Sequence, residues 1–164
     1  MLEVVLLVHN VRSAHNVGSL LRSADGLGAS RVILCGYTPY PKHPGDKRLP
    51  HLAEKTHQRI LKTALGAEIS VPWLHTEDIS EPIASLKRDG FEIAAIEQTS
   101  GAIDIKKFKP SDKKLALIVG PEIGGLDRTV LDQADVHLQI PMRGKKESLN
   151  VAVAGAIALF SVAA

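Results

Sequence analysis

The chain of 164 residues is short of aromatic side chains and of cysteine, and both shortages narrow its fold. Aromatic residues make up only 4% of it, so the core has to be built mainly from Val, Ile, Leu and Ala. That composition favours a sheet covered by helices over a sandwich that packs around aromatic side chains. Cys35 is the single cysteine, which excludes an internal disulfide and a metal site made of cysteines alone. A reducing, cytoplasmic setting is the simplest interpretation.

The sequence also lacks the signals of export and of membrane insertion. The segment 1–10 has neither a basic start nor a cleavage site, so it does not resemble a signal peptide. The longest apolar run, Val151–Ala164, has fourteen residues with mostly small side chains, which is too short to span a bilayer. We expect this run to form a buried helix. The net charge is only +2, so it says little about partners, and no membrane partner is expected.

The chain alternates short apolar segments with polar segments that have a helical pattern. We expect strands at 2–8, 31–35, 71–74, 91–96, 114–119 and 136–140, and helices at 15–27, 53–65, 78–89, 128–134 and 148–162. This alternation indicates a single α/β domain over residues 1–164, with a mostly parallel sheet flanked by helices. With 45% hydrophobic residues, the chain is large enough to bury a substantial core.

Four loops that follow predicted strands carry the unusual polar residues. They are HNVRSAHN after the first strand, EQTSG after residues 91–96, GPEIGGLD after 114–119 and PMRGKKESLN after 136–140. In parallel α/β sheets, ligands bind beyond the carboxyl ends of the strands. We therefore expect the functional site at this edge of the sheet.

The loop GPEIGGLD has three glycines, and a single carboxylate, Glu122, lies in the middle of it. Glycine lets a backbone bend sharply and approach a ligand closely. The loop has neither the dinucleotide fingerprint nor the phosphate-loop pattern, which argues against an enzyme that uses NAD or ATP. It can still bind a flat heterocycle through backbone groups. A plain turn before a helix is the alternative interpretation.

The last loop leads into an Ala-rich helix at 148–162, for which Ser148 is a candidate N-cap. Asn150 would then lie in the first turn and reach back to the preceding loop. The small side chains of this helix suit tight packing, in the core or against another molecule. In the first loop and helix, Asn16 and Arg22 are six residues apart, so they do not share a helix face and only tertiary contacts can relate them. An ordinary surface arginine is the alternative for Arg22.

Three stretches taken together resemble a known family. HNVRSAHNVGSLLRSADGLG, LALIVGPEIGGL and IPMRGKKESLNVAVAGAIALF, in this order, are similar to the three motifs of the SpoU (TrmH-like) branch of the SPOUT RNA methyltransferases. The resemblance extends over nearly all of residues 4–160 and includes the segments CGYTPYP and KTALGAE. It implies a SPOUT fold with a deep trefoil knot at the C-terminal end, a homodimer, and S-adenosyl-L-methionine as cofactor. It also implies methylation of a ribose 2′-hydroxyl in transfer or ribosomal RNA, with transfer RNA slightly favoured.

The same resemblance assigns roles to residues of this chain. The positions that match the family's catalytic residues are Arg22, Asn16, Glu122, Ser148 and Asn150. The backbone that matches the adenosine site is that of Gly120, Ile140 and Leu149, and the pocket is expected to be completed by Gly125, Leu126, Met142, Glu97, Gln98 and Thr99. No metal is expected. Arg22 matches an arginine often proposed as a general base, but a guanidinium does not readily lose its proton. We favour phosphate binding and stabilisation of the developing alkoxide by Arg22.

RNA contacts are expected from two groups of cations. Six Lys and Arg residues against two acids fall between Lys42 and Lys62, and a second group lies beside the third motif. The residues expected to contact RNA are Arg12, Arg48, Arg143, Lys145 and Lys146. A solvated polar helix face is the alternative for the first group. The few aromatic residues argue against a platform that stacks a single strand.

No separate RNA-binding domain is visible in the sequence, so we expect the dimer surface or a partner to recognise the RNA. The alternative function is a non-catalytic RNA-binding or assembly protein on the same fold. The presence of all five motif residues argues against that alternative, because a retired active site need not keep them.

Overall fold

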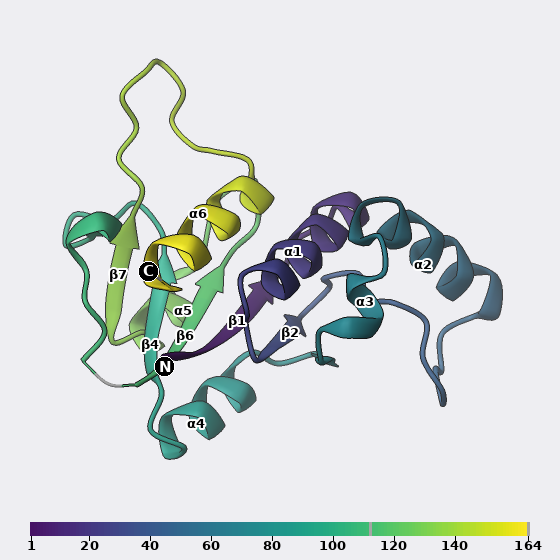
Figure 1. Cartoon of the computed structure of the whole chain (residues 1–164). Coiled ribbons are helices and arrows are strands. Elements are labelled where there is room, and N and C mark those ends of the chain that lie inside the picture. The colour runs from purple at the N-terminus through teal and green to yellow at the C-terminus, as the bar shows by residue number, and fades with distance from the viewer. Residues whose placement is uncertain (112, 164) are drawn as a thin grey trace.

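The computed structural model describes residues 1–111 and 113–163, which form one seven-stranded sheet with the order β3-β2-β1-β6-β4-β7-β5. The strands are β1 (Glu3–His9), β2 (Arg31–Cys35), β3 (Trp73–Thr76), β4 (Glu92–Ile96), β5 (Ile103–Asp104), β6 (Lys114–Val119) and β7 (Val136–Gln139). Neighbouring strands pair in parallel, so their carboxyl ends lie at one edge of the sheet (Figure 1). The predicted parallel α/β architecture is confirmed.

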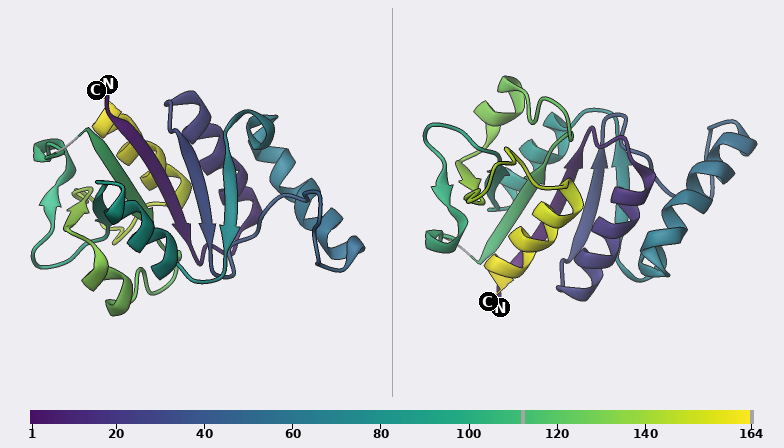
Figure 2. Two further views of the ribbon diagram at one scale, coloured as in Figure 1. Left: turned by 90° about the horizontal axis from the view of Figure 1, so that it is seen from below. Right: turned by 90° about the horizontal axis from the view of Figure 1, so that it is seen from above.

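Helices cover both faces of this sheet. They are α1 (Ala14–Gly26), α2 (Pro50–Ala64), α3 (Ala67–Ser70), α4 (Ser80–Arg88), α5 (Arg128–Gln133) and α6 (Val151–Ala163), with a 3-10 helix η1 (Ile105–Lys107). Helices α1 and α6 lie side by side on one face, and α4 and α5 lie on the other (Figure 2). In the residues described, no helix is both long enough and apolar enough to cross a membrane.

Strand β1 shows why the apolar runs are continuous and do not alternate with polar residues. It is buried from Val4 to His9, because helices cover the sheet on both sides. Leu6 and Val8 point into the core beneath α1 and α6, whereas Val5 and Leu7 belong to the core beneath α4 and α5.

Four helices begin at residues other than those predicted, and for α1 the difference is a single residue. Helix α2 begins three residues early, because Pro50 suits the first helical position, and α4 begins at Ser80, whose N–H donates to Asp78. Ser148 as the N-cap of α6 is wrong. Asn150 caps the helix, since its Oδ1 accepts the N–H groups of Ala152 and Val153 at 2.9 and 3.2 Å.

The short elements β5 and α3 were not predicted, because neither is long enough to show a periodic pattern. The expected helix over the apolar run is confirmed as far as Ala163, and Ala164 lies outside the described residues. None of these differences affects the four loops that were expected at the carboxyl edge of the sheet.

Gly18 marks a close approach of α1 and α2. A Cβ at this position would overlap Thr63 Oγ1 and the Ile60 carbonyl oxygen, and would lie 2.9 Å from the Ala64 nitrogen. We expect Gly18→Ala to lower the free energy of unfolding by about 2 kcal/mol, within the usual cost of overpacking, because the backbone of α2 must move. Denaturant unfolding measures this, with Gly26→Ala as the matched control in open space on the same helix. Equal stability of the two variants would contradict the prediction.

Candidate active site

A cavity of about 430 Å³ opens beyond the carboxyl ends of β4, β6 and β7. This volume is within the range of small-molecule pockets. Three of the four loops that the sequence singled out form its walls. The expected cofactor residues that line it are Glu97, Gln98, Gly120, Gly125, Ile140, Met142 and Leu149, and the expected catalytic residues that line it are Glu122 and Ser148.

Two of the expected cofactor residues, Leu126 and Thr99, do not line this cavity. Leu126 is 5% exposed and supports Gly120, where a Cβ would lie 2.6 Å from the Leu126 side chain. The Thr99 hydroxyl is 3.0 Å from Nδ1 of His137 on β7. Leu126 therefore supports the wall from behind, whereas Thr99 contacts β7.

The carboxylate of Glu97 holds the loop after β6 against the end of β4. Its Oε2 accepts the N–H of Leu126 at 2.9 Å, and its Oε1 accepts the N–H of Gln98 at 3.2 Å. Gly125 is essential to this contact, because its φ is +66° and a Cβ there would overlap Glu97 Oε2. The loop after β6 is thus built around a carboxylate from a different strand.

Gln98 holds the third wall in a similar way. Its side-chain amide donates to the carbonyl of Glu147 at 2.9 Å, which fixes the loop after β7 just before Ser148. The adjacent residues Glu97 and Gln98 therefore connect all three walls. The family resemblance placed both in the pocket, but no local pattern indicates that they bind the two other loops.

A chain of polar side chains joins the three motifs beside the cavity. Asn16 Nδ2 donates to Glu122 Oε1 at 2.9 Å, and Asn150 Nδ2 donates to Asn16 Oδ1 at 3.2 Å. Asn16 is placed by the start of α1, where the N-cap Ser13 accepts its backbone N–H. The structure thus brings together Asn16, Glu122 and Asn150, which are far apart in the sequence.

Arg22 does not join this group within one copy of the chain. It is exposed on α1 and lines a separate hollow with Ser19, Ser23 and Lys62. This agrees with its spacing from Asn16, which predicted that the two side chains would leave the helix on different faces. In the described chain, the hollow around Arg22 shares no lining residue with the cavity.

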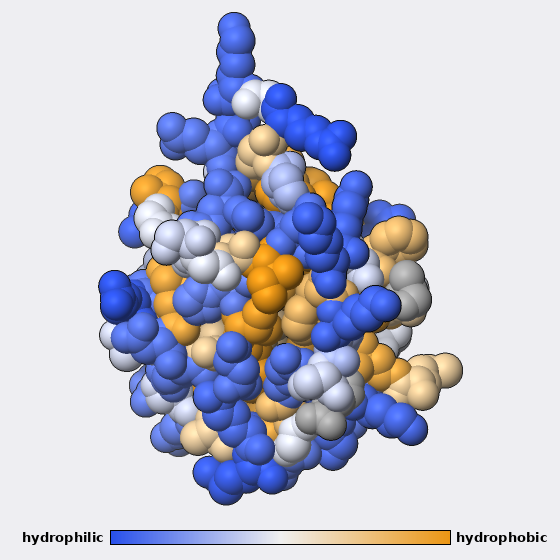
Figure 3. All heavy atoms as spheres, turned by 90° about the vertical axis from the view of Figure 1, so that its left-hand side faces the viewer, coloured by the Kyte–Doolittle hydropathy of each residue, from blue (hydrophilic) through white to orange (hydrophobic). Residues whose placement is uncertain are grey.

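The other expected RNA-binding cations divide into exposed and engaged side chains. Arg143, Lys145 and Lys146 are exposed on the loop that projects from the top of the molecule (Figure 1). The same projection is hydrophilic in the space-filling view, with apolar atoms showing below it (Figure 3). Arg12 is also exposed, in the loop after β1.

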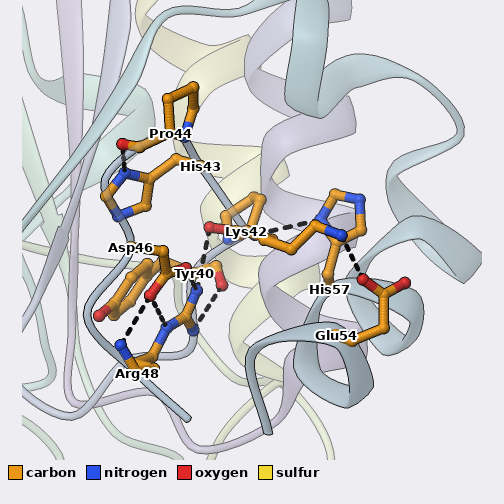
Figure 4. A network of polar contacts seen from close by, with 9 residues as sticks. Tyr40, Lys42, His43, Pro44, Asp46, Arg48, Glu54 and His57 are labelled. Carbon is orange, nitrogen blue, oxygen red and sulfur yellow. Dashed lines mark hydrogen bonds and ion pairs between the residues drawn. The ribbon is translucent and has the colours of Figure 1, made fainter. Parts of the chain in front are cut away.

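Arg48 is instead engaged in the loop between β2 and α2 (Figure 4). Its guanidinium donates to Asp46 at 2.6 and 3.0 Å and to the carbonyls of Tyr40 and Pro41 at 3.0 and 3.2 Å. It also lies over the Tyr40 ring at 3.6 Å, and its hydrogen bonds hold the pKa of Asp46 well below the ordinary value. Arg48 therefore stabilises the conformation of this loop through contacts within the chain.

Catalysis by a cysteine nucleophile finds little support in the structure. Burial raises the pKa of the Cys35 thiol to about 12, so it stays protonated and is a poor nucleophile. Over residues 1–111 and 113–163, no group of three or more His, Cys, Asp or Glu side chains is arranged to hold a metal ion.

The sequence matches the model of the SpoU rRNA Methylase family over residues 3–160. A Staphylococcus aureus protein named as a TrmH family tRNA/rRNA methyltransferase is 33% identical over 161 residues, which are 98% of this chain and 58% of that protein. The chain thus spans little more than half the length of the curated relatives it matches.

Solved structures give the same result. The AdoMet-bound rRNA methyltransferase from Sinorhizobium meliloti matches with a TM-score of 0.81 and 26% identity, over 97% of this chain and 55% of that one. A structure described as an RNA 2′-O ribose methyltransferase matches with a TM-score of 0.77 and 26% identity, over 97% of this chain and 55% of that one. The match to the family model contains every loop that meets at the cavity, and the chain therefore belongs to the SpoU rRNA methylase family.

Proposed function

We propose that this chain is an S-adenosyl-L-methionine-dependent methyltransferase that acts on a ribose 2′-hydroxyl of structured RNA, with transfer RNA slightly favoured over ribosomal RNA. The observation that carries the proposal is the polar chain of Asn16, Glu122 and Asn150 beside a cavity of cofactor size. The relatives named for RNA methylation and the solved 2′-O ribose methyltransferase support it.

The cavity suits this cofactor in both shape and charge. Apolar side chains such as Leu138, Ile140 and Leu149 can flank a flat adenine, with backbone groups of the glycine-containing loop nearby. The carboxylates of Glu97, Glu122 and Glu147 also line the cavity, and they complement a ligand with sulfonium and ammonium charges. When bound, S-adenosyl-L-methionine supplies a methyl group that its sulfonium makes electrophilic.

The residues of the chain then have to orient the ribose and manage one proton. Asn16, Ser148 and Asn150 hold the 2′-hydroxyl in line, and such positioning is a large source of rate. The proton that the 2′-hydroxyl would lose on methylation has a phosphate oxygen of the RNA as its acceptor. Arg22 binds that phosphate and stabilises the developing alkoxide.

A chemical role of Arg22 needs a second copy of the chain, because Arg22 does not line the cavity of its own chain. We therefore propose a homodimer in which Arg22 of the partner subunit completes the site. The exposed apolar side chains of Val153 and Phe160 on α6, and of Ile123 beside the cavity, provide a surface for the contact.

The dimer is expected to persist at micromolar concentration in sedimentation velocity experiments. Phe160→Glu should shift it toward monomers, because a charge would be buried in the contact. Leu52→Glu is the matched control, since Leu52 is an exposed apolar residue on α2, away from α6. A monomeric wild-type protein would remove the proposal, and with it the role of Arg22 across subunits.

We also propose the deep trefoil knot at the C-terminal end and one catalytic domain over residues 1–164. The path of the chain supports the knot: after β7, residues 140–149 return past the ends of β4 and β6, and α6 packs on α1. In this proposal the exposed cations Arg12, Arg143, Lys145 and Lys146 contact RNA phosphates. The buried thiol of Cys35 and an RNA substrate agree with a cytoplasmic setting.

Labelled S-adenosyl-L-methionine, incubated with the protein and separate pools of transfer and ribosomal RNA, tests the proposal. Nuclease digestion of the labelled RNA should release the label as a 2′-O-methylated nucleoside. A label on a base would contradict the ribose assignment. Cofactor binding without transfer to either pool would favour the non-catalytic alternative.

Glu97 provides a test of the cofactor site that does not depend on RNA. We expect Glu97→Ala to weaken S-adenosyl-L-methionine binding by roughly 10-fold, because a hydrogen bond to a charged group is lost and the loop at Leu126 is released. Glu97→Gln should restore much of the affinity, since its carbonyl oxygen can accept the same N–H. Calorimetry measures both, and equal affinities for all three proteins would show that this contact does not shape the site.

A further inference from the structure

Tyr37 is an exposed aromatic side chain at the edge of the sheet that carries the cavity. It follows β2, and 56% of its surface is accessible. Arg12 follows β1, and its guanidinium carbon lies 5.8 Å from the centroid of the Tyr37 ring. The nearby Tyr40 differs, because Arg48 at 3.6 Å and His75 at 4.0 Å cover its ring. The ring of Tyr37 is thus accessible to a ligand, whereas the ring of Tyr40 is covered.

The turn that presents Tyr37 is held by Asn10, which lies in the loop after β1 and has an unusual backbone conformation. Asn10 has a φ of +53°, which is rare for a residue other than glycine, and its Oδ1 accepts the Tyr37 N–H at 3.1 Å. A Cβ at Gly36 would overlap that same oxygen. Strained backbone of this kind persists where the surroundings fix it, and it is common at functional sites.

Thr38 binds the two loops together from below. It is 1% exposed, and its hydroxyl accepts the Val11 N–H at 3.2 Å and lies 3.0 Å from the Val8 carbonyl oxygen. The backbones next to Arg12 and Tyr37 are therefore fixed to each other. The backbone beneath both exposed side chains is held by contacts that neither side chain makes.

The pair is next to the cavity in the order of the sheet. The cavity lies beyond β4, β6 and β7, and the strands that follow at the same edge are β1 and then β2 (Figure 1). Arg12 also precedes the first turn of α1, where Asn16 contacts Glu122. A substrate that reaches past this contact from the cavity meets Arg12 first and Tyr37 next.

We propose that Tyr37 and Arg12 form a stacking site for one unpaired base of the substrate RNA, near the methylated ribose. An aromatic ring and a guanidinium both offer planar faces on which unpaired RNA bases stack. The inference rests on the proposed function for its substrate and adds a means of recognition. It is one stacking position, which agrees with a chain that has few aromatic residues.

The probe is a single-stranded uridine decamer with one central 2-aminopurine, whose fluorescence falls when the base stacks. The wild-type protein should bind it and quench it. Tyr37→Ala should bind it roughly 10-fold more weakly, the range expected for one lost base stack, and should not quench it. Tyr37→Phe should behave as the wild type. Failure of the wild type to quench, or full quenching by Tyr37→Ala, would overturn the proposal.

Two controls separate stacking from charge and from subunit contact. The salt dependence of binding should be the same for Tyr37→Ala and the wild type, because a stacked base releases no counterion, whereas Lys145→Ala should lower the slope by about one. Arg12→Lys keeps the charge and should still reduce quenching, since an ammonium has no planar face. Dissociation of the dimer by Tyr37→Ala in sedimentation would assign the pair to a protein interface and overturn the proposal.

The result is independent of catalysis. Quenching by the wild type without methyl transfer to any RNA would reject the proposed function and leave the stacking site in place. Methyl transfer without quenching would keep the proposed function and reject the stacking site. In the active enzyme, Tyr37→Ala should raise KM for RNA and leave the affinity for S-adenosyl-L-methionine unchanged.

Discussion

Replacing Arg22 by alanine should lower the single-turnover rate of methylation by roughly 100-fold or more at saturating RNA, as expected for the loss of one preorganised electrostatic group. The fold and the cofactor affinity should change little, because Arg22 is exposed and lines a hollow apart from the cavity. Arg22→Lys should recover little, since a point charge cannot reproduce the planar contact with a phosphate and a hydroxyl.

Lys145→Ala is the control for simple phosphate binding, and it should weaken RNA binding while keeping the rate at saturation. Mixing Arg22→Ala and Asn16→Ala protomers then tests the arrangement across subunits. If Arg22 acts in the partner's site, each mixed dimer regains one intact site and activity returns. Wild-type turnover of Arg22→Ala at saturating RNA would reduce Arg22 to a phosphate contact and reject its chemical role.

Gly120→Val should abolish measurable binding of S-adenosyl-L-methionine. A Cβ at Gly120 would lie 2.6 Å from Cγ and Cδ2 of Leu126 and 3.2 Å from its nitrogen. Leu126 cannot easily yield, because it is 5% exposed and its N–H is bound to Glu97. The substitution therefore displaces the loop that forms one wall of the cavity.

Calorimetry measures the loss, and circular dichroism checks that the variant still folds. Gly144→Ala is the matched control on the loop after β7, because a Cβ there would meet no atom within 4 Å. It should bind the cofactor as the wild type does. Undiminished affinity of Gly120→Val would show that the cofactor site lies elsewhere.

The apolar runs predicted the strands well, because strands covered on both faces need continuous apolar residues such as those of β6. Local sequence patterns could not predict the order of the strands in the sheet. β6 lies between β1 and β4, and this pairing depends on contacts between segments far apart in the chain. A deep knot leaves no local pattern at all, and only the family resemblance implied it.

In the candidate site, too, some features could be predicted from the sequence and others could not. Resemblance identified Glu97, but the hydrogen bond from Leu126 joins residues 29 apart and no spacing rule predicts it. Ser148 and Asn150 are both good N-caps, and only the path of the loop decides between them. The ion pair of Arg48 could have been predicted from the sequence, because Asp46 is only two residues away.

The bond from Gln98 to the carbonyl of Glu147 has a consequence for how the two ligands affect each other. Glu147 follows Lys146, a proposed phosphate contact, so the RNA surface and a wall of the cavity share a few residues of backbone. Any factor by which bound RNA changes the affinity for the cofactor must equal the factor by which the cofactor changes the affinity for RNA. An RNA affinity measured without cofactor therefore describes a different thermodynamic state from the one in which the two ligands meet.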